Sequence, residues 1–75
     1  MAIVRLHLNL IDLAGGKKEL LVDAKEPVVL TTLLDRLRIP HKEVGLIVRN
    51  RKGDVIDCLI HDEDVVELFP FLSGG

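Results

Sequence analysis

Apolar and polar residues alternate along the first dozen positions of the chain, which predicts a strand. The apolar side carries Val4, Leu6, Leu8 and Leu10, and the polar side carries Arg5, His7 and Asn9. A period of two places successive side chains on opposite faces of a half-buried strand, which we predict over residues 2–12. The glycines within residues 14–17 favour a turn. Residues 18–23 then predict the returning strand of a hairpin.

The spacing of the leucines changes after Pro27 to that of a helix. Four leucines recur at i, i+3, i+4 and i+7, and together they form one apolar stripe on an α-helix. They are Leu30, Leu33, Leu34 and Leu37. We expect Pro40 to end this helix, because the residue before a proline is driven away from helical backbone angles.

Three more strands are predicted after the helix, over residues 44–50, 54–57 and 65–69, separated by a turn at 50–53 and a loop at 61–64. In the last strand Val66 and Leu68 should point inward, and Glu67 and Phe69 outward. A hairpin, one helix and three strands favour an α+β fold in which a mixed sheet packs on one main helix. The predicted core is Val4, Leu6, Leu8, Leu20, Val22, Leu33, Leu34, Leu37, Ile47, Val66 and Leu68.

Length, charge and cysteine content narrow the function classes. Seventy-five residues make one domain, and a formal net charge of −2 argues against nucleic-acid binding, which favours a basic surface. No apolar run approaches the roughly 18–20 residues of a membrane span, and residues 1–5 lead into alternation rather than into a signal peptide. The single cysteine leaves no internal disulfide. We therefore expect a cytoplasmic protein with no nucleic-acid or membrane partner.

The residue types that usually carry catalysis are scattered in this sequence. Cys58 has no basic cluster beside it to lower its pKa, so a small buried hydrophobe is expected. His7, His41 and His61 lack the spacing of a metal-binding pair. The acidic residues 62–64 lack the ligands and glycine of a calcium loop, and we interpret them as a solvated turn. With no nucleophile, base and orienting group in view, we expect neither an enzyme nor a bound metal or cofactor.

The last six residues follow the final predicted strand and end in two glycines. Glycine has no Cβ, so Gly74 and Gly75 would form a thin thread ending in a free α-carboxylate. Six residues at about 3.3–3.6 Å each span roughly 20 Å, which is long enough to enter the active site of another protein. We therefore divide the chain into a domain at 1–69 and a flexible tail at 70–75. The carboxylate of Gly75 is the expected reacting group, with Gly74 and Ser73 threading behind it.

The run from Asp64 to Gly75, DVVELFPFLSGG, resembles the end of the ThiS/MoaD family of ubiquitin-like sulfur carriers, which have the β-grasp fold. The family ending has the form D-x-V-x-x-x-P-x-x-x-G-G. The leucine stripe of the helix and the strand and turn over residues 48–53 resemble the family as well, so the likeness covers nearly the whole chain. The sequence departs from the family pattern at Glu63, where glycine is common, and at Phe71, where a second proline is common.

The resemblance implies a mechanism and a set of partners. An ATP-dependent, ubiquitin-activating-type enzyme would adenylate the carboxylate of Gly75, and a sulfurtransferase would convert it to a thiocarboxylate. A synthase large subunit or a thiazole synthase would then take the sulfur for molybdopterin or thiamin. The pair Phe69-Pro70 is closer to the small subunit of molybdopterin synthase than to the thiamin carrier. Phe69, Pro70, Phe71 and Leu72 are the expected partner-binding residues. Phe69 points outward from the last strand and Phe71 and Leu72 follow it, so these three should form an exposed apolar patch.

Two alternatives share parts of this interpretation. A ubiquitin-like protein modifier would use the same fold, tail and activation, but would join Gly75 to lysines of target proteins. A regulatory or RNA-binding β-grasp module would make the Gly-Gly ending incidental, and the acidic charge balance argues against it.

Overall fold

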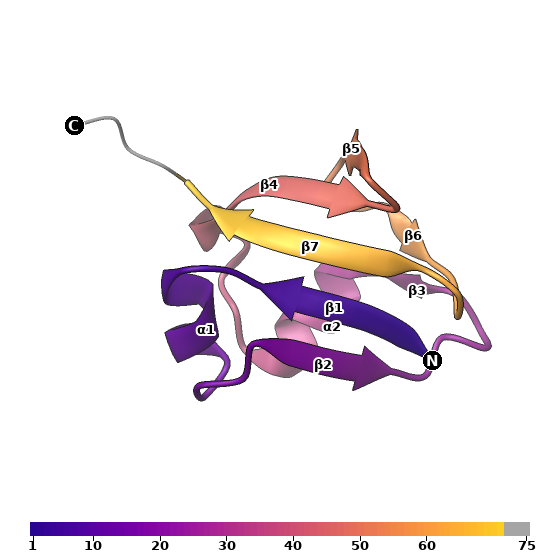
Figure 1. Ribbon diagram of the computed structural model, residues 1–75, viewed down its shortest axis with the longest axis horizontal. Coiled ribbons are helices and arrows are strands. Elements are labelled where there is room, and N and C mark those ends of the chain that lie inside the picture. Colours follow the sequence, from indigo (N-terminus) through magenta and orange to yellow (C-terminus); the bar gives the residue numbers. More distant parts are fainter. Residues whose placement is uncertain (72–75) are drawn as a thin grey trace.

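The computed structural model describes residues 1–71 of the chain (Figure 1). Its elements, in chain order, are β1 (Ala2–Leu6), α1 (Asn9–Leu13), β2 (Glu19–Val22), β3 (Val28–Val29), α2 (Leu30–Leu37), the 3₁₀ turn η1 (His41–Glu43), β4 (Val44–Arg49), β5 (Lys52–Asp54), β6 (Leu59–Ile60) and β7 (Val65–Pro70).

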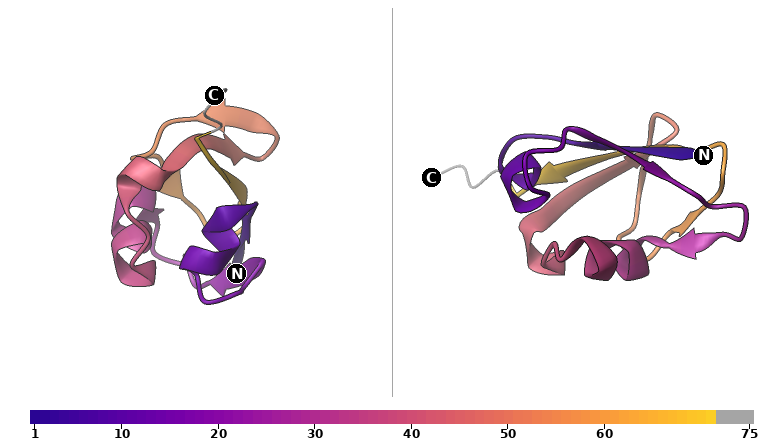
Figure 2. Two further views of the ribbon diagram at one scale, coloured as in Figure 1. Left: turned by 90° about the vertical axis from the view of Figure 1, so that its left-hand side faces the viewer. Right: turned by 90° about the horizontal axis from the view of Figure 1, so that it is seen from below.

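A five-stranded mixed sheet forms one layer, and α2 forms the other (Figure 2). The strand order is β2-β1-β7-β4-β5, so that β7 lies in the centre of the sheet. It runs parallel to β1 and antiparallel to β4. The short strands β3 and β6 pair separately in a second, two-stranded sheet. This arrangement confirms the predicted mixed sheet packed on one main helix.

The core lies between the sheet and α2, where apolar side chains of both layers meet. Most of the predicted core positions are buried: Val4, Leu6, Leu33, Leu34, Ile47, Val66 and Leu68. Three more pack against the core while partly buried: Leu20, Val22 and Leu37. The helix stripe was therefore predicted correctly. The helix ends at Arg38, which takes left-handed angles (φ 59°, ψ 35°), while the Ile39 amide donates to the Leu34 carbonyl at 3.0 Å.

The prediction of one strand over residues 2–12 was wrong. β1 ends at Leu6, and the chain turns at Leu8 into the short helix α1. Leu8 is therefore 61% exposed and does not belong to the core, whereas Leu10 is fully buried from α1. Residues 10, 11 and 14 also share one face of a helix, so the alternation that predicted a long strand is equally compatible with a strand followed by a helix.

The predicted strand over residues 54–57 was also misplaced. The turn is confined to Asn50 and Arg51, both with positive φ, so β5 pairs with β4 as soon as the turn ends. Residues 56 and 57 form a turn of their own. The pairing of β6 with β3 was not anticipated, because two-residue strands are too short to show a period. β7 continues to Pro70, one residue beyond the predicted end.

Within residues 1–71, no helix has the length and apolar character needed to cross a membrane.

Candidate functional site

The central strand β7 brings the end of the described chain to one end of the sheet. Val66 and Leu68 are fully buried on its inner side, while Glu67 and Phe69 are half-buried on its outer side, as predicted. Pro70 is buried and pairs with Val44 at the end of the ladder. β1 pairs with β7 as far as Leu68, and β4 pairs with it as far as Pro70, so the end of β7 has a defined position and direction.

The chain leaves the sheet through a shallow apolar depression of about 380 Å³, lined by Gly45, Leu46, Phe69, Pro70 and Phe71. We call these five residues the exit groove. Phe71 is 65% exposed and Leu46 is 50% exposed, so two large apolar side chains face solvent here. An exposed apolar patch of this kind is typical of a protein interaction site.

Gly45 shapes the exit groove. Val44 pairs with Pro70 and Leu46 pairs with Phe69, so Gly45 is the extra residue of a β-bulge in β4. A Cβ at Gly45 would lie only 2.8 Å from the Phe71 Cα and backbone nitrogen. The absence of that Cβ allows the backbone of Phe71 to lie directly against β4.

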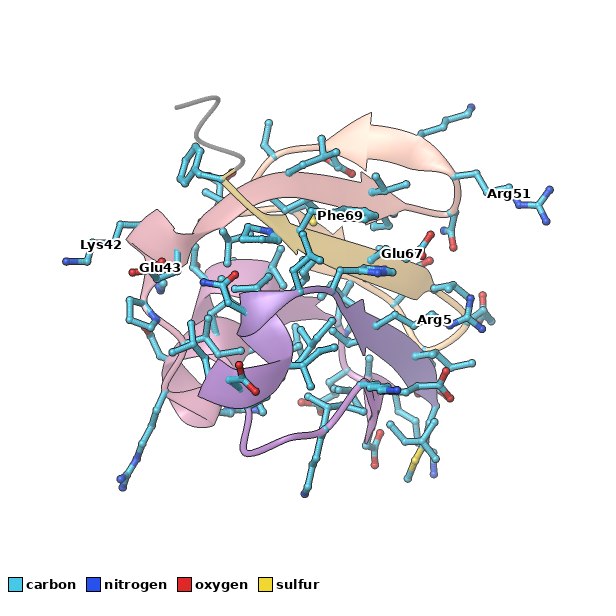
Figure 3. All side chains as sticks on the ribbon, turned by 60° about the vertical axis from the view of Figure 1, so that its left-hand side comes forward. Arg5, Lys42, Glu43, Arg51, Glu67 and Phe69 are labelled. Atoms are coloured by element: carbon cyan, nitrogen blue, oxygen red, sulfur yellow. The ribbon has the colours of Figure 1, made fainter. Side chains whose placement is uncertain are left out.

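On the outer face of the sheet, the ring of Phe69 lies flat against the ring of His7. The two ring centroids are 4.2 Å apart and the rings are inclined by 6°. His7 Nε2 lies 3.2 Å from Glu67 Oε1 and donates its hydrogen to that carboxylate. Figure 3 shows Phe69 and Glu67 along β7 on the face that also carries Arg5. The stack and the hydrogen bond together hold the Phe69 ring in place at the rim of the exit groove.

A buried carboxylate anchors the start of β7. Asp64 is only 7% exposed and accepts hydrogen bonds from the His61 amide (2.8 Å), Asn50 Nδ2 (2.8 Å) and Arg49 Nη1 (3.5 Å). Burial by itself would raise the pKa of Asp64, but the donated hydrogen bonds outweigh it and leave the pKa below its ordinary value. Asn50 Oδ1 in turn accepts from the Val65 amide at 2.9 Å. The interpretation of residues 62–64 as a solvated turn was therefore wrong for Asp64.

Cys58 is buried, as predicted, and burial raises the pKa of its thiol. The thiol is therefore protonated at neutral pH, and a thiolate nucleophile is disfavoured at this position. Within the described part of the chain, no group of three or more His, Cys, Asp or Glu side chains is placed to hold a metal ion.

The structure brings three of the predicted partner-binding residues together in the exit groove: Phe69, Pro70 and Phe71. The other predicted site residues, Leu72, Ser73, Gly74 and Gly75, lie outside the described residues. Sequence reasoning missed Gly45, Leu46 and His7. A lone glycine inside an apolar strand is a known signal of a bulge or a close backbone approach, and it could have identified Gly45.

No family model matches the chain, and no curated protein sequence matches it either. The solved structures that are similar to the chain include two that match it over nearly their whole lengths. The first, from Pyrococcus furiosus, is assigned as molybdopterin converting factor, subunit 1; it is 20% identical, with a TM-score of 0.70 over 95% of this chain and 97% of that one. The second is SAMP1 from Haloferax volcanii; it is 22% identical, with a TM-score of 0.71 over 99% of this chain and 98% of that one. The chain therefore has the β-grasp fold of these two proteins, the fold that its sequence predicts.

Proposed function

We propose that this chain is a ubiquitin-like sulfur carrier that reacts through the carboxylate of Gly75. One observation carries the proposal: the central strand β7 ends in the exit groove, and the sequence continues from Phe71 with Leu72, Ser73, Gly74 and Gly75. The described chain thus stops at an apolar surface, a few residues before the Gly-Gly pair in the sequence. The β-grasp fold and the two similar structures support the same reading.

The chemistry requires an activating partner, because a carboxylate is a poor acyl donor. An oxygen of the Gly75 carboxylate attacks the α-phosphate of ATP, and pyrophosphate leaves. The resulting acyl adenylate has AMP as its leaving group, so a persulfide sulfur from a sulfurtransferase can displace it. A thiol then attacks the donor's sulfur in this acyl disulfide. The thiocarboxylate of Gly75 leaves, and the thiol and the donor are joined in a new disulfide. ATP belongs to the activating enzyme, and the carrier itself binds no cofactor.

The exit groove is the proposed docking surface for these partners. Its exposed Phe71 and Leu46 offer apolar area, and aromatic side chains are frequent anchors of protein interfaces. The ring of His7, the residue after β1, stacks on Phe69 of β7, and the two rings extend this surface as a pre-formed platform. A partner that covers this end of the sheet would also reach the residues that follow Phe71.

We propose molybdopterin rather than thiamin synthesis as the destination of the sulfur. Phe69-Pro70 supports this choice, and so does the similarity to a molybdopterin converting factor subunit. The partner that accepts the sulfur would then be a synthase large subunit. Sulfur transfer to a thiazole synthase, with none to a molybdopterin synthase large subunit, would overturn the choice of pathway.

Conjugation to proteins is the second candidate function. The structural similarity to SAMP1, a ubiquitin-like small archaeal modifier, supports it, and conjugation would begin with the same acyl adenylate as sulfur transfer. A lysine amine would then displace AMP and form an isopeptide bond.

Mass spectrometry of the protein purified from its own cells distinguishes these functions. A sulfur-for-oxygen exchange on Gly75 supports the carrier, and branched peptides that join Gly75 to lysine support the modifier. The same spectrum identifies the residue that carries the C-terminal carboxylate. A chain with neither change, together with no ATP–pyrophosphate exchange by a matching activating enzyme, would contradict both.

Deletion of Gly75 is the direct test of the reacting group. The deletion should abolish carrier-dependent ATP–pyrophosphate exchange and leave the melting temperature unchanged, because the buried core is formed by residues between Ala2 and Leu68. Lengthening the chain by one residue should also block exchange, since alignment of reacting groups supplies roughly 7–11 kcal/mol of a barrier. Exchange that survives the deletion would refute the proposed chemistry.

A further inference from the structure

Leu8 has a backbone conformation that suits glycine rather than leucine. Its φ is 55° and its ψ is −133°, which lies outside the left-handed helical region that asparagine and other residues occasionally occupy. The Leu10 amide donates to the His7 carbonyl at 3.2 Å, so Leu8 is the first central residue of a tight turn. These angles are those of a type II′ turn, in which that position is normally glycine.

Within residues 1–71, the packing of Leu8 does not explain why a leucine stands there. Its side chain is 61% exposed, so it adds little to the core. Among residues 1–71, the other non-glycine residues with positive φ lie at a helix C-terminus (Arg38) or in a hairpin turn (Asn50 and Arg51), whereas Leu8 lies at the N-cap of α1. Leu8 therefore combines a strained backbone with an exposed apolar side chain, and strain of this kind is typical of functional positions.

The strained turn lies at the same end of the sheet as the exit groove. β1 and β7 are parallel and in register from Ile3 opposite Val65 to Leu6 opposite Leu68, so both strands end at the same edge (Figure 1). The His7 amide donates to the Leu68 carbonyl at 3.1 Å, and the His7 ring stacks on Phe69. Leu8 is the next residue along the chain, and it follows directly from the platform beside the exit groove.

The length of chain beyond Phe71 indicates which partner covers this end. Whatever path they follow, residues 72–75 span at most about 14 Å. An enzyme that holds the carboxylate of Gly75 must therefore lie over the end of the sheet at which β1 and β7 stop. The activating enzyme is the first protein that the proposed function brings to that carboxylate.

We propose that Leu8 is a docking anchor for the enzyme that adenylates Gly75, and that the type II′ turn holds its side chain outward for insertion into an apolar socket of that enzyme. This inference rests on the proposed function. The backbone angles of the turn direct the leucine side chain outward at this end of the sheet, away from the core. Its cost is a less stable free domain, and its benefit is an interface side chain that is already in position before the enzyme binds.

Two substitutions separate the strain from the contact. Both Leu8→Gly and Leu8→Ala remove the anchor, but only glycine accepts the observed angles without strain. At an ordinary position glycine is less stable than alanine; at Leu8 the order should invert, with Leu8→Gly melting at least about 4 °C above Leu8→Ala. In ATP–pyrophosphate exchange with a matching activating enzyme, both variants should raise the KM for the carrier about tenfold and leave kcat unchanged.

Leu21→Ala is the matched control. Leu21 is 66% exposed, and it pairs with Ile3 at the opposite end of β1. This variant should keep the KM within about twofold of the wild-type value, the range of ordinary surface changes. An equal increase for Leu21→Ala and Leu8→Ala would overturn the assignment of Leu8 as an anchor.

The outcomes distinguish this inference from the proposed function. If both Leu8 variants keep the wild-type KM while deletion of Gly75 abolishes exchange, the docking role of Leu8 is refuted and the carrier function stands. If exchange persists without Gly75, the carrier function itself fails. If Leu8→Ala melts above Leu8→Gly, the turn is not strained, and the proposal that a strained turn holds the Leu8 side chain outward is wrong.

Discussion

Asp64 should be the most stabilising polar side chain of the domain, and Asp64→Asn tests this role with little change in shape. The carboxylate accepts from three donors on two segments, residues 49–50 and residue 61. Asparagine at position 64 keeps one acceptor oxygen and replaces the other with an NH₂ group. That NH₂ group then faces an N–H donor, so one hydrogen bond is lost. Asn50 cannot rotate its own amide to compensate without losing its hydrogen bond from the Val65 amide.

The expected loss follows from these contacts. A hydrogen bond to a charged group contributes about 1.5–3 kcal/mol, and one buried donor left without a partner costs a similar amount, so we expect a loss of about 2–3 kcal/mol. A chain of 75 residues has a total stability of roughly 4–11 kcal/mol. Since 1 kcal/mol shifts the melting temperature of so small a domain by about 4–8 °C, the variant should melt roughly 8–24 °C lower.

The pH dependence identifies the charge as the cause. The pKa of Asp64 is lowered in the folded state, so its stabilisation is fully present above the unfolded value, about 3.9, and disappears as the pH falls through the folded value. Urea unfolding of both proteins between pH 7 and pH 2.5 should show a constant difference down to about pH 4, which then narrows at lower pH.

Asp57→Asn is the control for Asp64→Asn. Asp57 is exposed in the turn before Cys58, and the same change of charge there should alter stability by less than about 0.5 kcal/mol. A difference between wild type and Asp64→Asn that stays equally large at pH 2.5 would refute the electrostatic explanation, because a protonated Asp64 no longer holds the charge-assisted bonds.

Four further substitutions test the core and the site. Leu34→Ala should cost about 2–5 kcal/mol, because Leu34 is fully buried between α2 and the sheet; a loss below about 0.5 kcal/mol in urea unfolding would remove it from the core. Phe71→Ala should leave the melting temperature nearly unchanged, since Phe71 is 65% exposed, yet weaken binding of the activating enzyme or the synthase in calorimetry; wild-type affinity for both would refute its docking role. Gly45→Ala should displace Phe71 from β4, because the new Cβ would lie 2.8 Å from its Cα, and amide chemical shifts at Phe71 that stay unchanged would contradict this. Cys58→Ala should retain ATP–pyrophosphate exchange, because burial raises the pKa of the thiol; lost exchange in a variant that still folds would place the sulfur chemistry on Cys58.

The candidate site was only partly accessible to sequence reasoning. The Gly-Gly ending and the outward direction of Phe69 follow from the order and the parity of residues, so both could be predicted locally. His7 and Phe69 are 62 positions apart, and their stack exists only because β1 and β7 are parallel neighbours. The contact between Gly45 and Phe71 likewise requires the antiparallel register of β4 and β7 with its bulge.

By itself the sequence determined the long, strongly periodic features of this protein: the leucine stripe of α2, the inward and outward sides of β7, and the two-layer α+β architecture. A helix stripe over two turns and an alternating strand can be recognised in the sequence, because their period depends only on local backbone geometry. Only the tertiary structure decided where β1 ends, since residues 8–10 fit either a strand or a helix entry. It also decided that β3 pairs with β6 across 30 residues, and that Asp64 is a buried anchor rather than a solvated acid. These outcomes depend on partners distant in the chain, whose contacts outweigh local preference.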